Sequence, residues 1–319
     1  MPDEVLACEV PTVSVLIPTY NRADVLPLCL AHLERQTFPD FEVVIVDDGS
    51  SDGTAEWLAG YVRSTTLSIR TARQENAGAA RARNVAVGMA RGKVSVILGD
   101  DILCSPELVE THHRFHQEHP EDAVAGLGLT RWCETGQVVT PFMRWMDESG
   151  TQFAYGDLLR GTKPNWRHFY TSNLSLKTEM LRKYPFIEAF PGCGMEDMEL
   201  GYRLEQREGM KVTFLREALA QHIHPIDFSR ACRRAFQTGL SLQVFDRLWP
   251  DRPAGVHGWL HRGLKEILVQ NAWLLGSAAG VAGWVTERWC PNPLIRPVLA
   301  WHVEVARRRV SILPKTAVN

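Results

Sequence analysis

The chain has 319 residues, of which 45% are hydrophobic and 23% are charged, and its formal net charge is -2 at pH 7. That length suits one large domain, or one domain with an appendage. Because a nucleic-acid backbone is bound by a basic surface, the balanced charge argues against a nucleic-acid partner. The seven cysteines form no C-x-x-C pair, so neither a disulfide framework nor a zinc cluster is indicated. Together with an acidic N-terminus that lacks the features of a secretory signal, this predicts a cytoplasmic protein.

Strand-like and helix-like segments alternate over the first hundred residues. Apolar runs at 13–20, 41–48, 67–72 and 94–101 are separated by helical patterns at 23–36, 53–62 and 78–92. This βαβ order predicts an α/β fold with a Rossmann-like, mostly parallel sheet flanked by helices. In such sheets ligands bind beyond the carboxyl ends of the strands, which is where the polar clusters of this sequence lie.

The turn after the first strand reads "PTYNR", residues 18–22. It contains neither G-x-G-x-x-G nor G-x-x-x-x-G-K-[ST], which argues against an ordinary NAD enzyme and a P-loop NTPase. The second strand ends in Asp47 and Asp48, which from the residues alone fit turn and cap chemistry as well as ligand binding. The fourth ends in Asp100 and Asp101. Two adjacent carboxylates at the end of a buried strand are either solvated by a turn or held by a cation.

Five segments follow one another along the chain: "VSVLIPTYNRADVL", "TFPDFEVVIVDDGSSDGT", "NAGAARARNVAVGMARG", "GDD" and "GMEDMELGYRL". In this order they resemble glycosyltransferase family 2, over about residues 13–225. The resemblance implies an α/β protein with a GT-A fold that binds a nucleotide-diphosphate sugar. It also implies transfer of the sugar to an acceptor hydroxyl with inversion at the anomeric carbon. The acceptors that this family serves are glycans, lipid-linked intermediates and small molecules.

The resemblance assigns two groups of residues to the nucleotide. The base and ribose pocket is lined by Pro18, Tyr20, Arg22, Asp47 and Asp48. In the turn before the third helix, where backbone N–H groups and arginines suit nucleotide or phosphate contacts, the implied residues are Asn76, Gly78 and Arg83. A solvated basic helix face is the alternative for this second group. Asp100 is expected to touch hydroxyls of the ribose or of the sugar.

"GDD" stands where the family carries its D-x-D motif, so Asp101 is implied to hold Mg²⁺ or Mn²⁺ against the diphosphate. Gly99 replaces the first acid, and we expect weak cation binding before the nucleotide binds. His222 and His224 are two apart on an extended segment, so both imidazoles face one side. In metal-dependent relatives a histidine at this place completes the cation site, and we favour His222 slightly over His224. A histidine packed under the C-terminal helices is the alternative.

The stretch "PGCGMEDMELGYRL" delivers two carboxylates to the start of a helix, where the helix dipole favours negative charge. By resemblance, Asp197 is the general base that takes the proton of the acceptor hydroxyl. Glu196 is expected to orient the acceptor or the base. From the residues alone, an acidic first turn that complements the dipole explains the same pattern.

The predicted organisation is a glycosyltransferase domain over residues 1–225 and a C-terminal helical extension over 226–319. Within the first, a nucleotide-binding half covers about residues 1–104 and an acceptor half about 105–225. No charged residue occurs from 267 to 286. This segment is long enough to span a membrane, but a helical cap on the domain is favoured, and a peripheral contact with the inner face of a membrane is the other alternative.

Three further interpretations concern the acceptor half. Four histidines follow one another on a helix with no ligand spacing, and we interpret them as surface residues: His112, His113, His116 and His119. Ser172 and Asn173 are predicted near the sugar. The segment 132–166 is interpreted as an irregular, aromatic-rich loop that shapes the acceptor site or belongs to the core.

Two other functions compete with sugar transfer. The missing acid at Gly99 is compatible with a non-catalytic protein that binds sugar nucleotides or glycans. A nucleotidyltransferase would share the sheet, but it should carry a glycine-rich, basic loop after the first strand, and "PTYNR" has no glycine.

Overall fold

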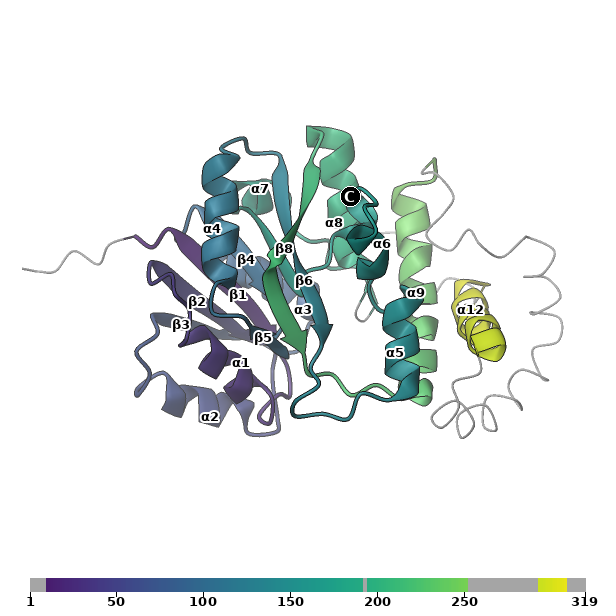
Figure 1. Ribbon diagram of the computed structural model, residues 1–319, viewed down its shortest axis with the longest axis horizontal. Helices are drawn as coiled ribbons and strands as arrows, with labels where there is room; N and C mark the ends of the chain where they lie inside the picture. Colours follow the sequence, from purple (N-terminus) through teal and green to yellow (C-terminus); the bar gives the residue numbers. More distant parts are fainter. Residues whose placement is uncertain (1–9, 192–193, 252–291, 309–319) are drawn as a thin grey trace, which may run out of the picture.

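The computed structural model describes residues 10–191, 194–251 and 292–308 (Figure 1). Its strands are β1 (Val13–Thr19), β2 (Phe41–Asp47), β3 (Ile69–Arg73), β4 (Val94–Leu98), β5 (Ile102–Cys104), β6 (Val124–Trp132), β7 (Asn173–Lys177) and β8 (Lys211–His222). Its helices are α1 (Leu26–Leu33), α2 (Thr54–Tyr61), α3 (Ala79–Met89), α4 (Leu108–Glu118), α5 (Pro141–Glu148), α6 (Tyr155–Leu159), α7 (Thr178–Lys183), α8 (Glu196–Glu208), α9 (Phe228–Leu248) and α12 (Asn292–Arg308), with a short 3-10 helix, η1 (Trp166–His168).

The strands form one eight-stranded sheet in the order β3-β2-β1-β4-β7-β6-β8-β5. Strands β1 to β4 pair in parallel, as the βαβ pattern predicts. In the second half β7 runs antiparallel to β4 and β6, β8 runs parallel to β6, and β5 runs antiparallel to β8. The predicted α/β class is therefore confirmed, and the sheet is mixed, with its antiparallel pairings confined to the second half.

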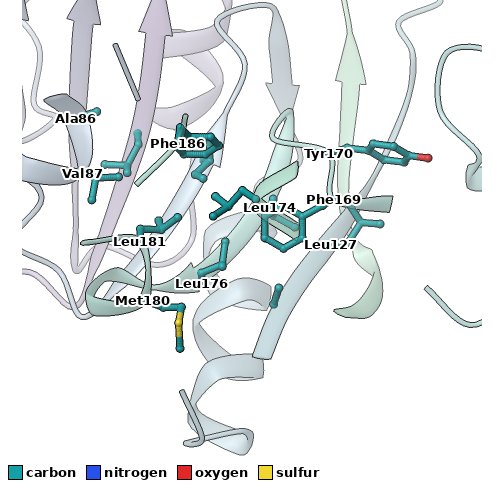
Figure 2. Packing of buried hydrophobic residues seen from close by; sticks show 14 of the residues in the cluster. Ala86, Val87, Leu127, Phe169, Tyr170, Leu174, Leu176, Met180, Leu181 and Phe186 are labelled. Atoms are coloured by element: carbon teal, nitrogen blue, oxygen red, sulfur yellow. The ribbon is translucent and has the colours of Figure 1, made fainter. Parts of the chain in front are cut away.

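Helices cover both faces of the sheet, which is why its strands read as continuous apolar runs. On one face Val15 and Ile17 of β1 pack in a buried cluster with α1, α2 and α4. On the other face Leu16 packs with α3, α7 and α8. Figure 2 shows part of this second cluster, with Val87 of α3 and Leu181 of α7.

The C-terminal helices pack beside this sheet (Figure 1). Phe142 of α5, Phe228 of α9 and Ile295 of α12 share one buried cluster. Tyr202 of α8 and Phe245 of α9 share another. In the part of the chain that the structure describes, the predicted C-terminal helices are confirmed, and α9 joins them to the acceptor half.

The segment 132–166 is more regular than predicted, because it contains α5 and α6. Phe142 and Trp145 are buried there, so these aromatics belong to the core. The charge-free segment 267–286 lies outside the described residues, and its interpretation stays a prediction. Among the helices that the structure describes, none has the length and apolarity needed to cross a membrane.

Two histidines of α4 are buried, which corrects the prediction that all four lie at the surface. His112 Nδ1 lies 2.8 Å from Ser175 Oγ, and His112 Nε2 lies 2.9 Å from Asn173 Oδ1. His116 Nε2 lies 3.0 Å from the same hydroxyl oxygen of Ser175. The reason is helical spacing: Leu108, His112 and His116 lie four residues apart, so one face of α4 turns all three toward the sheet.

Asn173 anchors a bulge in β8. Its amide donates to Ala218 O at 2.9 Å, and its side chain is fully buried instead of facing the open edge of the sheet. At the bulge Gly128 of β6 pairs with Leu215, but the next residue of β6 pairs with Leu219, so β8 carries three extra residues there. Gly128 makes room for the amide, because a Cβ at this position would lie 2.2 Å from Asn173 Nδ2.

Candidate active site

The polar turns after β1 and β2 are joined by reciprocal hydrogen bonds. Asn21, in the left-handed conformation at φ 53°, donates its N–H to Ser50 Oγ at 2.8 Å. Its side-chain oxygen accepts from Ser51 N–H at 2.8 Å. Asn tolerates this conformation because its short polar side chain bonds locally. The turn therefore holds Tyr20, which is 47% exposed, and Arg22 at the carboxyl edge of the sheet.

Asp48 is used to hold the start of α3. Its carboxylate accepts from Ala77 N–H and Gly78 N–H, both at 2.9 Å, and from the side-chain amide of Gln74 at 2.6 Å. Asp48 is buried, so these bonds replace the water that it would otherwise need. The position of Gly78, which has φ 93°, is thus fixed by the end of β2.

Asp47 faces a residue that the sequence interpretation missed. Its carboxylate accepts from Ser50 N–H at 3.0 Å and lies 3.2 Å from Arg73 Nε, at the end of β3. An open pocket of about 530 Å³ lies beside this pair, lined by Gly49, Arg73, Gln74, Glu75 and Asn76. The signal was present in the sequence, because Arg73 ends a parallel strand and so shares the edge with the other polar turns.

Arg22 bridges the two carboxylates of the "GDD" turn. Arg22 Nε lies 3.3 Å from Asp100 Oδ1, and its Nη2 lies 3.4 Å from Asp101 Oδ2. Both aspartates are buried, so a charged partner is required if both are to be ionised. Burial and the neighbouring charge of Asp101 raise the pKa of Asp100 to about 7.

Asp101, His222 and His224 form a candidate cation site. His222 Nε2 lies 3.3 Å and His224 Nδ1 lies 3.1 Å from Asp101 Oδ2, and one ligand atom of each residue lies within 4.8 Å of the others. Burial alone would raise the pKa of Asp101, but the two imidazoles hold it well below its usual value. Burial also lowers the pKa of His224, which favours the neutral, metal-binding imidazole.

The donor set of this site fits a divalent cation. One carboxylate suits Mg²⁺ and Mn²⁺, whereas imidazole nitrogen suits transition metals. The site therefore fits Mn²⁺ better than Mg²⁺. Both predicted histidines lie beside Asp101, because β8 pairs with β5 in a register that sets His222 opposite Ile102.

Two aromatic side chains, Trp132 and Phe153, lie against His222. The ring of Trp132 stacks on the imidazole with centroids 5.3 Å apart and planes 5° apart, and Trp132 is itself held by a hydrogen bond from Nε1 to Met143 O. The Phe153 ring lies 6.1 Å from the same imidazole. The sequence showed only that this segment is rich in aromatics, with no pattern that would place them at His222.

The second carboxylate centre lies at the start of α8. Gly194 and Met195 both have positive φ, 101° and 82°, so the chain turns sharply before Glu196. Glu196 is buried and accepts from Arg83 Nη1 and Gly194 N–H, both at 2.8 Å. Asp197 follows and accepts from Met198 N–H at 2.7 Å.

The surroundings of Asp197 raise its pKa. Burial is the largest cause, and the charge of Glu196 the next, of a pKa raised to about 7. A general base works best when its pKa lies near the operating pH. A carboxylate with this pKa takes up and releases a proton near neutrality, which an acidic first turn exposed to water would not do.

The structure thus brings most of the predicted residues together at the carboxyl edge of the sheet. Pro18 lies in β1 and Asp47 ends β2, and the other residues of this group lie in the turns after β1, β2, β3 and β4: Tyr20, Arg22, Asp48, Asn76, Gly78, Asp100 and Asp101. They are joined by His222, the last residue of β8, and by His224, two residues beyond it. Arg83 differs from the interpretation, because its guanidinium pairs with Glu196. The nucleotide, metal and base roles of all these residues stay predictions.

The mixed sheet thus carries its polar turns at one edge, with an Asp-His-His cluster beside them. The family model described as Glycosyl transferase family 2 matches residues 14–184, and the chain belongs to this family. The predicted family is therefore confirmed.

Named relatives and solved structures agree with this assignment. The chain is 34% identical over 244 residues to a validoxylamine A glucosyltransferase of Streptomyces hygroscopicus subsp. jinggangensis (strain 5008), covering 66% of this chain and 54% of that protein. It is 27% identical over 267 residues to a chondroitin synthase of Escherichia coli, covering 74% of this chain and 38% of that protein. The chain spans about half the length of the first of these relatives.

Two solved structures share the fold. A mannosyltransferase, PcManGT from Pyrobaculum calidifontis, in complex with GDP-Man and Mn²⁺, superposes with a TM-score of 0.65 at 19% identity, covering 94% of this chain and 88% of that chain. Residues 1–349 of TarS from S. aureus superpose with a TM-score of 0.51 at 18% identity, covering 93% of this chain and 89% of that chain. The GT-A fold predicted from the sequence is confirmed.

Proposed function

We propose that this protein is an inverting glycosyltransferase that moves a sugar from a nucleotide-diphosphate sugar to an acceptor hydroxyl, with help from a divalent cation and with Asp197 as general base. The observation that carries the proposal is the presence of two carboxylate centres with different surroundings: Asp101 lies 3.3 and 3.1 Å from two imidazoles, and Asp197 follows the buried Glu196 at the start of α8. The pKa of Asp101 is lowered by two imidazoles, whereas the pKa of Asp197 is raised by burial and by Glu196. Asp101 is therefore suited to binding a cation, and Asp197 is suited to accepting a proton.

Asp197 performs the proton transfer. Its ionised carboxylate accepts the proton of the acceptor hydroxyl, and the hydroxyl oxygen attacks the anomeric carbon from the face opposite the diphosphate. The bond between the anomeric carbon and the diphosphate oxygen breaks, and the nucleoside diphosphate leaves with the electron pair. A single displacement of this kind inverts the anomeric carbon, and needs no covalent intermediate on the protein.

The residues at the strand ends hold the donor. Asp101, His222 and His224 would hold a divalent cation, which neutralises the charge of a diphosphate leaving group when bound. Tyr20 is exposed at the same edge, and the pocket beside Arg73 and Asn76 is open to a nucleoside. Arg22 pairs with Asp100 at the same edge.

Two structural relatives support the choice of ligands. PcManGT was solved with GDP-Man and Mn²⁺, and TarS was solved with UDP. A glycan, a lipid-linked intermediate or a small molecule would supply the acceptor hydroxyl. We also propose a cytoplasmic location, with a peripheral contact between the C-terminal helices and the inner face of a membrane as the alternative for lipid-linked acceptors.

The proposal is tested with a panel of UDP-, GDP- and dTDP-sugars, each with Mn²⁺, Mg²⁺ or EDTA. Binding is measured by calorimetry and slow hydrolysis by release of the nucleoside diphosphate. We expect one donor to bind and to be hydrolysed only with a cation and with Asp101 intact. The Asp101→Ala variant should lose both properties, while Asp122→Ala, at an exposed aspartate, should keep them.

Other results would support the competing functions. Donor binding without hydrolysis, under every cation and with every acceptor, would favour a non-catalytic sugar-nucleotide binding protein. Release of pyrophosphate from a nucleoside triphosphate and a sugar phosphate would favour a nucleotidyltransferase.

A further inference from the structure

Arg83 lies in α3, yet its guanidinium is directed toward α8. Arg83 Nη1 and Glu196 Oε1 are 2.8 Å apart, and the two side chains are only 12% and 4% exposed. The guanidinium carbon also lies 5.4 Å from the centroid of the Phe186 ring. The charge of this arginine is therefore balanced by a carboxylate without a phosphate, and its Nε is buried with no hydrogen-bond partner among the described residues.

The next residue, Asn84, holds the segment that leads to the turn before α8. Its side-chain amide donates to Phe186 O at 2.9 Å, and its side-chain oxygen accepts from Phe186 N–H at 2.8 Å. This pair of bonds imitates the pairing of a neighbouring strand. A third bond, to Glu188 Oε1 at 2.9 Å, ties the amide to the same segment.

Both carboxylate oxygens of Glu196 accept hydrogen bonds. One carboxylate oxygen accepts from Arg83, and the other accepts from Gly194 N–H. Gly194 and Met195 have positive φ, a conformation that costs free energy for Met and persists only when its surroundings hold it. The Glu196 carboxylate therefore closes the turn that sets the direction of the next side chain, Asp197.

Helix α3, which carries Arg83 and Asn84, is held at its N-terminus by the end of β2. Asp48, at the end of β2, accepts from the N–H groups of Ala77 and Gly78 just before α3 begins. Helix α3 thus connects the polar turn after β2 with the turn before α8.

We infer that Arg83 and Asn84 are positioning residues that hold the Glu196 turn so that Asp197 faces the acceptor, and that Arg83 does not bind the nucleotide. This inference rests on the proposed function, in which Asp197 is the general base. It revises the sequence interpretation, which placed Arg83 with the nucleotide.

The inference makes a prediction about charge at Asp197. The charged and titratable groups that face it are Glu196 of α8, Arg83 of α3 and Tyr170 of the segment before β7. Glu196 raises the pKa of Asp197 and Arg83 lowers it. Removing Arg83 alone leaves an unpaired buried carboxylate beside the base, whereas removing both charges takes away two opposing effects.

The first experiment separates positioning from nucleotide binding. The affinities of UDP and of GDP, each with Mn²⁺, are measured by calorimetry for the wild type, Arg83→Met and Arg114→Met, the last being a control at an exposed arginine of α4. We expect all three proteins to bind the preferred nucleotide with the same affinity within about twofold. A loss of about tenfold or more in Arg83→Met, the size expected for a charged hydrogen bond to phosphate, would overturn the inference.

The second experiment measures how hydrolysis of the matching sugar nucleotide depends on pH, with saturating Mn²⁺. Arg83→Met should lower kcat and move the acid limb of the profile to higher pH by roughly one unit or more. Glu196→Gln should move the limb to lower pH, and the double variant should lie between the two. Arg83→Lys keeps the charge and should keep the limb near the wild-type position.

The remaining outcomes decide between two failures. The inference is wrong if Arg83→Met changes the donor KM and leaves the acid limb of the pH profile in place. It is also wrong if all variants lose activity only in proportion to the fraction of unfolded protein, with the acid limbs at the wild-type pH. If Asp197→Asn turns over like the wild type, the base assignment of the proposed function is wrong, and the inference fails with it. An inactive Asp197→Asn beside an unmoved Arg83→Met limb would overturn the inference alone.

Discussion

Replacing Asp197 with Asn is expected to remove most of the catalysis while leaving donor binding intact. The two side chains have the same shape, and the Asn oxygen still accepts the N–H of Met198, which lies 2.7 Å from Asp197 Oδ1. A positioned general base contributes about 10²–10⁴-fold to a rate. We expect kcat to fall by that factor and the affinity for UDP or GDP to change by less than about twofold, because the predicted nucleotide contacts lie on other elements.

The same carboxylate predicts the pH dependence of the wild type. Burial, and next the charge of Glu196, raise the pKa of Asp197 to about 7. The base is active when ionised, so activity is present above this pKa and is lost as the pH falls through it. At two pH units below the pKa, about one carboxylate in a hundred is ionised, which predicts a roughly 100-fold lower kcat at pH 5 than at pH 8.

The measurement is the release of nucleoside diphosphate, followed by chromatography at each pH so that no coupling enzyme contributes its own pH dependence. Mn²⁺ is kept saturating, which is verified by doubling its concentration, because imidazole ligands bind a cation only in their neutral form. The Asp197→Asn profile should lack the limb near pH 7. A variant within about fivefold of the wild type, or a wild-type limb below pH 5, would refute the reasoning.

Two predictions concern the buried contacts of Asn173, and both are measured by urea unfolding. Gly128→Ala would place a Cβ 2.2 Å from Asn173 Nδ2 and should destabilise the protein by about 1–3 kcal/mol. The control Gly88→Ala, with open space around the added Cβ, should be neutral or stabilising. Equal effects of the two substitutions would show that the β8 bulge has room for the added methyl group. Burial lowers the pKa of His112 to about 4, so below its usual pKa the unfolded chain binds a proton that the folded protein does not. His112 alone should therefore lower the stability by roughly 3 kcal/mol between pH 6.5 and pH 4, and His116, whose pKa is lowered to about 3 by burial, should add to this fall. His112→Gln should show a smaller fall over the same range, and identical slopes would contradict this assignment.

The first half of the fold follows from local sequence pattern. The apolar runs that become β1, β2 and β4 are covered on both faces, and parallel strands place their polar turns at one edge. For this reason the sequence alone is enough to group Asp47, Asp100 and their neighbours. Arg73 could have been added by the same rule, because it ends β3.

The second half depends on contacts that no local pattern records. Arg83 and Glu196 are 113 residues apart, and their pairing follows from the placement of α3 and α8 on the same face of the sheet. The sequence showed each charge separately, and each matched a simpler interpretation, a phosphate ligand or an acidic first turn. The histidines of α4 were misplaced for a similar reason, since Asn173 and Ser175, which satisfy them inside the protein, arrive from a distant strand.

The bulge in β8 decides to which face of the sheet the later residues of this strand point. Paired residues of neighbouring strands point to the same side of the sheet, and three extra residues between Leu215 and Leu219 reverse the alternation of everything that follows. His222 therefore faces Asp101 because the three extra residues let the end of β8 pair in step with Trp132 and Ile102. A deletion within 216–218 that the bulge absorbs should keep this pairing, whereas a slip of the paired segment 219–222 by one residue would turn His222 to the opposite face. The register of 219–222 thus sets the direction of His222, and the bulge is the place where this strand can change in length.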